Sequence, residues 1–150
     1  MEARMTKRLQ KDLEAIQKNY KDQFTVILPT NDLRLWYIEF TAPKGTVFAD
    51  EKFKLQFKFS SEYPIESPEV IFIGKVPEHE HIYSNGFICL SILYDEWSPA
   101  LTVASVCLSI VSMISSAPKK ARPFNDAEFC KRSQGRGPKA FLWSYDDTKC

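Results

Sequence analysis

The sequence predicts one domain of the α+β class, in which a helix precedes a four-stranded antiparallel sheet and a second helix packs on that sheet. Apolar residues recur at helical spacing over residues 5–16 and again over residues 103–114. Between these stretches lie β-rich runs that are separated by turn residues. The chain has 150 residues, of which 44% are hydrophobic, so it can bury one sizeable core but is short for two domains.

The first predicted helix occupies the N-terminal stretch of the chain. Its apolar positions recur every three or four residues, as expected of an amphipathic helix. They are Met5, Leu9, Leu13 and Ile16. Basic side chains fall on the other faces, including those of Lys7, Arg8 and Lys11. We therefore expect one face of this helix to be basic and solvated.

Four strands are predicted after Phe24, where the apolar period changes from that of a helix to that of a strand. The predicted strands are residues 24–28, 33–40, 53–59 and 70–73. In the third strand apolar and polar residues alternate, which indicates a sheet with one buried and one solvated face. Turn residues such as the Pro-Lys-Gly sequence at 43–45 separate the runs. An antiparallel meander is the topology that this spacing favours.

An irregular segment covers residues 74–101, and we name it the active-site loop because it contains Cys89. Loops of this length in compact domains are usually functional. The apolar stripe that follows predicts the core helix, and its members are Val103, Val106, Cys107, Ile110, Val111 and Ile114. Residues 119–139 are rich in Lys and Arg with little periodicity, and we interpret them as an irregular basic tail. We thus expect a core at 1–118 and a partly mobile, basic and aromatic extension at 119–150.

The overall charge and the cysteine spacing limit the possible functions. Twenty basic and nineteen acidic residues give a formal net charge of +1, so no global field draws this chain to nucleic acid or to a membrane. Its four cysteines form no Cys-x-x-Cys pair, which argues against a zinc site or a disulfide scaffold. No signal peptide is readable, and the most apolar stretch, 101–117, is too short to span a bilayer. We expect no metal or cofactor, and a location in the cytoplasm and nucleus.

Cys89 is the candidate nucleophile. It lies in the sequence Gly-Phe-Ile-Cys-Leu-Ser at 86–91, downstream of His79 and His81. A thiol between a glycine-containing turn and a short apolar run would sit at a defined edge of the fold, with polar side chains upstream able to reach it, which is the arrangement of a nucleophile. The alternative is a buried structural cysteine, the commoner state of free cysteine, and this is what we expect of Cys107. Cys130 and Cys150 fall in the tail and need no role.

These flanking residues resemble the active-site segment of ubiquitin-conjugating enzymes. In that family a histidine, a proline and an asparagine precede a Gly-x-Ile-Cys-Leu run, and a tryptophan and Ser-Pro-Ala follow it. Family-like motifs run from Lys7 to about Pro123, and include Trp36, Ala42-Pro43-Lys44-Gly45-Thr46, Tyr63-Pro64 and Trp97-Ser98-Pro99-Ala100. The resemblance implies the ubiquitin-conjugating fold over most of the chain.

Within the family, the chain most resembles the W-type enzymes. His81 stands where most members have asparagine, Ser91 follows Cys89, and the chain ends in Trp-Ser-Tyr-Asp-Asp-Thr-Lys-Cys at 143–150. The resemblance implies that Cys89 accepts ubiquitin from the activating enzyme as a thioester. It further implies transfer to a substrate amine, preferably the α-amino group of a flexible N-terminus, with a ligase of the RING or U-box type.

The acceptor amine itself favours this selectivity. With ordinary pKa values of about 7.7–8.0 for an α-amine and about 10.4 for lysine, the neutral fractions near pH 7 differ by a few hundredfold. A general base usually contributes roughly 10²–10⁴ in rate. A site without the usual asparagine and without a well-placed acid could therefore still modify N-terminal amines, although the lower nucleophilicity of the less basic amine offsets part of the gain.

Three further residues are candidates for roles in catalysis. His81 could donate to the oxyanion of the intermediate or relay a proton, or be purely structural. By family resemblance, His79 organises the turn. Asp126 could serve as an acid on the acceptor side, although a solvated loop acid is the simpler interpretation. Glu80 replaces the expected proline, which frees a backbone N–H and loosens φ beside the site.

The resemblance also places a partner-binding surface on this chain. Positions that the family uses to meet the activating enzyme and ligases match Lys7, Arg8, Lys11, Ile65, Pro99 and Ala100. Ile65 stands where many members carry phenylalanine, so the aromatic contribution to ligase contact is reduced. A solvated helix face is the alternative for the basic residues.

Two other functions compete with conjugation. A noncatalytic ubiquitin-binding variant of the fold would explain the departures at Glu80 and His81, but the presence of Cys89 argues against it. A thiol hydrolase would pair Cys89 with His79 or His81, yet the flanking motifs disfavour it.

Overall fold

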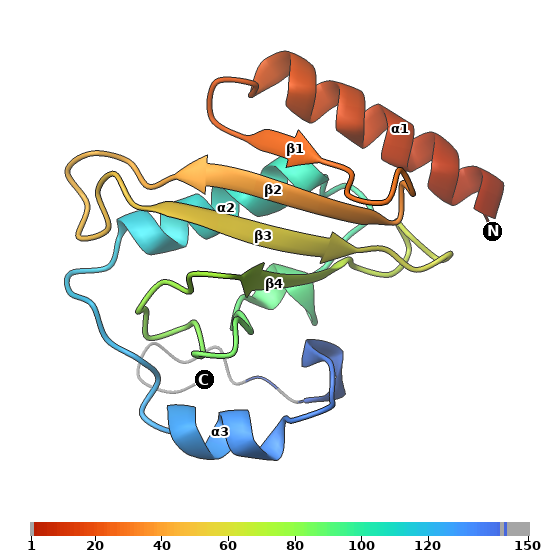
Figure 1. Cartoon of the computed structure of the whole chain (residues 1–150). Coiled ribbons are helices and arrows are strands. Elements are labelled where there is room, and N and C mark those ends of the chain that lie inside the picture. Colours follow the sequence, from red (N-terminus) through yellow and green to blue (C-terminus); the bar gives the residue numbers. More distant parts are fainter. Residues whose placement is uncertain (1, 142, 144–150) are drawn as a thin grey trace.

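A four-stranded antiparallel sheet in the order β1-β2-β3-β4 forms the centre of the molecule (Figure 1). The computed structural model describes residues 2–141 and 143. Its helices and strands are α1 (Glu2–Asn19), β1 (Thr25–Ile27), β2 (Leu35–Thr41), β3 (Lys52–Lys58), β4 (Glu69–Ile73), η1 (Ser91–Leu93), α2 (Val103–Ser115), α3 (Asp126–Arg132) and η2 (Pro138–Ala140). The predicted α+β class and the meander are confirmed. No helix in the described residues is long and apolar enough to cross a membrane.

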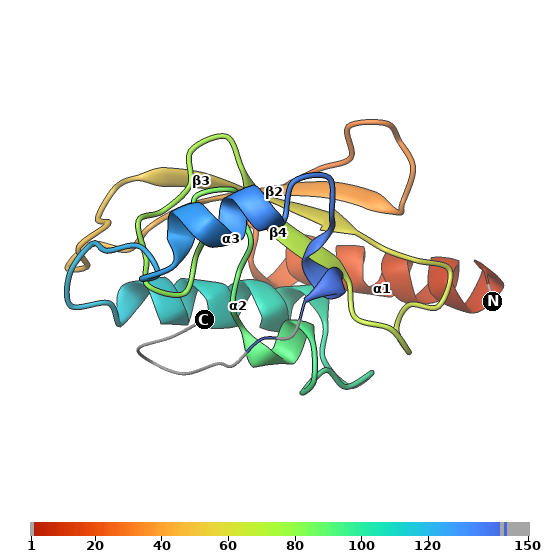
Figure 2. The ribbon, with the colours of Figure 1, turned by 90° about the horizontal axis from the view of Figure 1, so that it is seen from below.

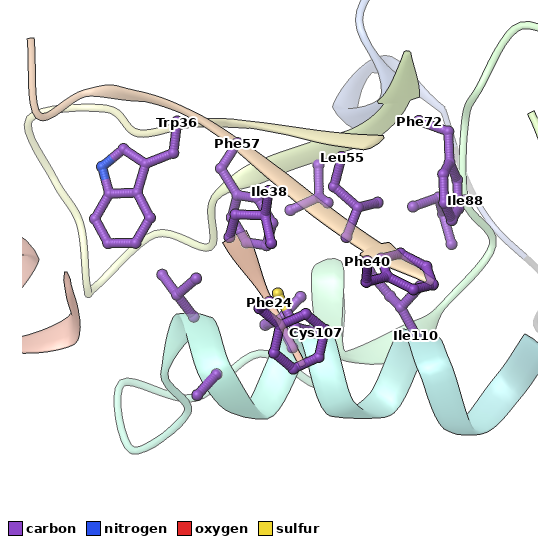
Figure 3. Packing of buried hydrophobic residues seen from close by; sticks show 14 of the residues in the cluster. Phe24, Trp36, Ile38, Phe40, Leu55, Phe57, Phe72, Ile88, Cys107 and Ile110 are labelled. Atoms are coloured by element: carbon purple, nitrogen blue, oxygen red, sulfur yellow. The ribbon is translucent and has the colours of Figure 1, made fainter. Parts of the chain in front are cut away.

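One face of the sheet is buried and the other is solvated, as the alternation predicted. Along β3 the side chains of Phe53, Leu55 and Phe57 are buried, while those between them are more exposed. In Figure 2, α1 and α2 lie on the same side of the sheet. Figure 3 shows Cys107 and Ile110 of α2 directed toward the buried strand residues. Cys107 is fully buried, and burial raises the pKa of its thiol, so its assignment to the core is confirmed.

A buried carboxylate joins α1 to α2. Asp12 is 3% exposed, and its Oδ2 accepts hydrogen bonds from the Tyr63 hydroxyl at 2.5 Å and from the Val103 amide at 3.3 Å. Its Oδ1 accepts from Arg8 Nε at 2.9 Å. Burial, followed by the bond to Asp12, raises the pKa of Tyr63. The carboxylate is therefore stabilised by three donors from three parts of the chain.

Tyr63→Phe is expected to lower the free energy of unfolding by about 1–3 kcal/mol, because it removes one donor from a buried charged acceptor. Urea denaturation near neutral pH measures the change. The matched control is Tyr37→Phe on the partly exposed strand β2, where a change within about 0.5 kcal/mol is expected. Equal changes in the two variants would show that the Asp12 contact contributes nothing.

Part of the C-terminal region is regular, so the prediction of an irregular tail is wrong for α3 and η2. Phe129 of α3 is 4% exposed, and its ring stacks on Tyr83 with centroids 4.0 Å apart. In Figure 1, α3 lies beyond β4, the edge strand of the sheet. The division of the chain at residue 118 stays a prediction.

Candidate active site

The loop that carries Cys89 is closed by a compact turn at Gly86. The amide of Gly86 donates to Tyr83 O and its carbonyl accepts from Phe72 N, both at 2.9 Å. Gly86 has a φ of +96°, and a Cβ at this position would lie 2.1 Å from Phe72 O. Only glycine combines this φ with so close an approach to β4. The turn thus fixes the active-site loop against the edge of the sheet.

Beyond this turn the chain doubles back and sets Cys89 opposite His81. Ile82 and Ile88 form an antiparallel bridge, and the Cys89 amide donates to His81 O at 2.8 Å. This short pairing explains why a histidine from the upstream arm of the loop lies beside the cysteine. The backbone therefore holds the two residues together.

Cys89 lies in the wall of a cleft of about 500 Å³. The cleft is lined by residues of the active-site loop, His79, Glu80, His81, Leu90 and Ser91, and by Met113, Ser116, Ala117, Pro118 and Lys119 from α2 and the residues after it. Cys89 itself is 4% exposed. The Cys89 sulfur is therefore less open than the sequence suggests, because it lies in the wall of a cleft. Cys89 is disulfide-bonded here, so thioester chemistry requires the reduced form.

His79 ties the active-site loop to α2. It is 5% exposed. Its Nδ1 accepts from the His81 amide at 2.9 Å, so the ring proton lies on Nε2, which donates to Met113 O at 3.1 Å. Burial is the main cause of a lowered pKa for His79, because desolvation disfavours the imidazolium form. A neutral ring with both nitrogens engaged suits positioning rather than proton transfer.

Arg122 holds the same loop from the other side, a role that the sequence did not indicate. Its Nη1 donates to Pro77 O at 2.5 Å and to Ile82 O at 3.3 Å, and its Nη2 donates to Val76 O at 3.1 Å. The amide of Ala121 also donates to Glu78 O at 3.2 Å. Since Arg122 is one of many basic residues in a stretch without period, no local pattern distinguishes it.

The two remaining catalytic candidates lie in different places. The ring of His81 lines the cleft with Cys89, and its centroid is 5.7 Å from that of His79. Asp126, by contrast, accepts from the Ser84 amide at 2.8 Å and from Cys130 Sγ at 3.4 Å. It is not among the described residues that line the cleft. The structure therefore brings His81, but not Asp126, to the cysteine.

An aromatic cluster packs against the loop that carries Cys89. Tyr83, Phe87 and Cys89 share this cluster with Phe129 and Trp143 of the C-terminal region. The indole of Trp143 donates to Pro138 O at 3.1 Å, and the residue is 8% exposed.

Within the described residues, no group of three or more His, Cys, Asp or Glu side chains is placed to hold a metal ion.

The predicted partner-binding residues gather at one end of the molecule. Lys7 and Lys11 are exposed on α1, and Ile65 is 60% exposed in its loop. The indole Nε1 of Trp97 donates to Pro64 O at 2.9 Å. This bond ties the loop of Ile65 to the loop of residues 98–100, in which Pro99 and Ala100 are exposed.

Arg8 differs from the other members of this set. Its guanidinium donates to Pro99 O at 2.7 Å and also to Leu101 O, besides its ion pair with Asp12. The side chain is 18% exposed. Arg8 therefore joins α1 to the 98–101 loop, and much of its bonding capacity is used within the chain.

Comparison with known proteins gives consistent matches over nearly the whole chain. A family model described as "Ubiquitin-conjugating enzyme" matches residues 8–141. The chain is 51% identical to "Probable ubiquitin-conjugating enzyme E2 W" of Dictyostelium discoideum, with 98% of each chain covered. It is 45% identical to "Ubiquitin-conjugating enzyme E2 W" of Caenorhabditis elegans, covering 95% of this chain and 96% of the relative.

Solved structures agree with the fold. The crystal structure of the ubiquitin-conjugating enzyme E2 UbcA1 from Agrocybe aegerita is similar with a TM-score of 0.82 and 37% identity, over 89% of this chain and 96% of that chain. An enzyme E2 from Plasmodium falciparum matches with a TM-score of 0.73 and 38% identity, over 77% and 86% of the two chains. With Cys89 in a cleft beside two histidines and a sequence match from residue 8 to residue 141, this chain belongs to the ubiquitin-conjugating enzyme family.

Proposed function

We propose that this ubiquitin-conjugating enzyme carries ubiquitin on Cys89 and transfers it to the N-terminal α-amine of substrate proteins. The observation that carries the proposal is that Cys89 and His81 line one cleft and are held side by side by the 2.8 Å bond from the Cys89 amide to His81 O. The first step is thioester exchange. The Cys89 thiolate attacks the C-terminal carbonyl of ubiquitin on the activating enzyme, and the cysteine thiolate of that enzyme leaves. A neutral amine then attacks the new thioester, the Cys89 thiolate leaves, and the amine nitrogen loses one proton to solvent or through His81.

The selectivity for α-amines follows from the groups near the sulfur. His81 occupies the position of the usual asparagine, and the Asp126 carboxylate is hydrogen-bonded to Ser84 and does not line the cleft, so the acid predicted for the acceptor side is not beside the sulfur to help deprotonate a lysine. An α-amine depends less on a general base, because its neutral fraction near pH 7 exceeds that of lysine by a few hundredfold. His81 in this proposal donates to the oxyanion or relays a proton. His79 organises the turn, a role that its two hydrogen bonds support.

The ligase partner is proposed to be of the RING or U-box type. Ile65, Pro99 and Ala100 are exposed on two loops that the Trp97–Pro64 bond holds together, which supports one contact surface. Lys7 and Lys11 would extend that surface along α1. We propose that the protein acts in the cytoplasm and nucleus on substrates with flexible N-termini.

Two acceptor peptides of equal length test the selectivity. The first has a free N-terminus and no lysine, and the second is acetylated and contains one lysine. After loading of the reduced enzyme, discharge to the first peptide is expected to be at least about tenfold faster near neutral pH, as the neutral fractions require. Mass spectrometry identifies the modified nitrogen. Equal rates, or ubiquitin mainly on lysine, would contradict the proposal.

A further inference from the structure

The cleft beside Cys89 contains a carboxylate that has no part in the transfer steps proposed for Cys89. Glu80 is the acidic residue among the described residues that line this cleft, and its side chain is exposed. We propose that Glu80 binds the ammonium form of the acceptor amine at the mouth of the cleft and raises its concentration beside the thioester. This inference rests on the proposed transfer of ubiquitin to amines and adds an acceptor-binding residue to it.

The backbone holds Glu80 in a defined place. The amide of Ile82 donates to His79 O at 3.0 Å, so residues 79–82 form a β-turn with Glu80 at its second position. The His79 ring reinforces this turn through the bond from the His81 amide. The second position of such a turn is one that proline favours, and proline is the residue expected here from the family resemblance. The turn therefore persists with glutamate, and the exchange adds a carboxylate.

The charges that face Glu80 decide how strongly it can act. Burial lowers the pKa of His79, and the negative charge of Glu80 acts in the opposite direction. The Glu80 carboxylate is therefore close enough to influence the protonation of a histidine that lines the same cleft. The lysine that lines the same cleft is Lys119. Within the described part of the chain, neither Glu80 nor Lys119 is in an ion pair. Glu80 is thus available to a cationic ligand, with Lys119 as its competitor.

The contribution of Glu80 to acceptor affinity is limited by the exposure of its carboxylate. Ion pairs at exposed sites contribute little, and the measured range corresponds to about 1.5- to 5-fold in affinity. The bound ammonium must release its proton to solvent before the neutral amine attacks the thioester, so we assign Glu80 to binding of the acceptor and not to the chemical step. The expected signature is a change in the half-saturating concentration of the acceptor, with little change in the maximal discharge rate.

Single-turnover discharge of the loaded, reduced enzyme provides the test. The acceptor is a lysine-free peptide with a free N-terminus, varied in concentration. Glu80→Gln is expected to raise the half-saturating concentration about 1.5- to 5-fold, and added salt should shrink the difference. Lys119→Gln should lower the half-saturating concentration by a similar factor. The control is Glu78→Gln, an exposed carboxylate close in sequence that does not line the cleft, and it should leave both parameters unchanged.

A neutral nucleophile separates binding from a structural role. Hydroxylamine is uncharged near neutral pH, so its discharge of the thioester should be the same in Glu80→Gln and the unchanged enzyme. If Glu80→Gln slowed discharge to the peptide and discharge to hydroxylamine equally, Glu80 would act by maintaining the turn, and the proposal would be overturned. An unchanged half-saturating concentration with the peptide would also overturn it.

The failure of this inference can be told apart from the failure of the proposed function. If ubiquitin is found on lysine, α-amine selectivity is wrong. The comparison of Glu80→Gln with the unchanged enzyme can then be made with the acetylated lysine peptide, because its ε-ammonium is also a cation.

Discussion

Gly86→Ala is expected to lower the free energy of unfolding by about 3–5 kcal/mol, because the added methyl group combines a backbone clash with a strained backbone conformation. The new Cβ would lie 2.1 Å from Phe72 O, a backbone atom. Neither strand β4 nor the turn can move aside without losing the 2.9 Å bond from Phe72 N to Gly86 O. Since whole domains are stable by only about 5–15 kcal/mol, the variant should unfold at much lower urea concentration or accumulate poorly.

Gly74→Ala is the matched control for this prediction. Gly74 also has a positive φ, of 71°, but no atom lies within 4 Å of a Cβ placed there. Alanine at Gly74 therefore carries only the cost of the left-handed backbone, about 1–2 kcal/mol. Urea denaturation of both variants separates backbone strain from the clash. Equal losses at the two glycines would show that the turn at Gly86 is free to move away from β4.

The second large effect is expected at Cys89. Cys89→Ala should abolish the thiol-sensitive ubiquitin adduct that forms with activating enzyme and ATP, because the sulfur proposed to carry the acyl chain is removed. Cys89→Ser should instead accumulate an adduct that resists thiols, since an oxygen ester is less reactive toward them. Electrophoresis of the reduced and loaded enzyme, with and without thiol in the sample buffer, distinguishes the thioester of the unchanged enzyme, the absent adduct of Cys89→Ala and the thiol-resistant adduct of Cys89→Ser.

Cys130→Ser provides the control, because Cys130 is half-buried in the cluster below the loop and bonds to Ser84 and Asp126. It should load as the unchanged enzyme does. An adduct that persists in Cys89→Ala would move the nucleophile to another residue. Complete absence of an adduct in the unchanged, reduced protein would favour the noncatalytic ubiquitin-binding alternative.

Elements with a long, regular apolar period were predictable from the sequence. The alternation over residues 53–59 defines β3, and the stripe over 103–114 defines α2, because each element buries one whole face. Helix α3 was not predictable, because it lacks such a regular apolar period. It has seven residues, and only Phe129 among them is buried, so its single anchor produces no repeat. Because the residues around α3 are rich in Lys and Arg, the composition of this stretch instead predicts a solvated tail.

The candidate site was predictable only where its members are close in sequence. Cys89 and His81 are predictable together because both lie in one short stretch that resembles the family's active-site segment, and in the structure an antiparallel bridge joins the arms that carry them. The walls supplied by Met113 and Lys119 depend on how α2 packs under the sheet, which no local pattern records. Arg122 falls in the stretch that the composition predicts to be an irregular basic tail, yet its guanidinium bonds to a carbonyl 45 residues away in sequence. Arginine on a polar stretch gives no sign of such a partner.

The stacking of Phe129 on Tyr83 makes two distant stretches of the chain open as one unit. If α3 lifted away, the rings of Tyr83 and Phe87 would be left facing water, so the loop cannot keep its packing without the helix. Cooperative units of this kind share one opening free energy. Backbone amides of α3 and of residues 83–89 are therefore expected to gain deuterium with a common protection factor, and a ligand that holds α3 in place is expected to slow exchange at Cys89 as well.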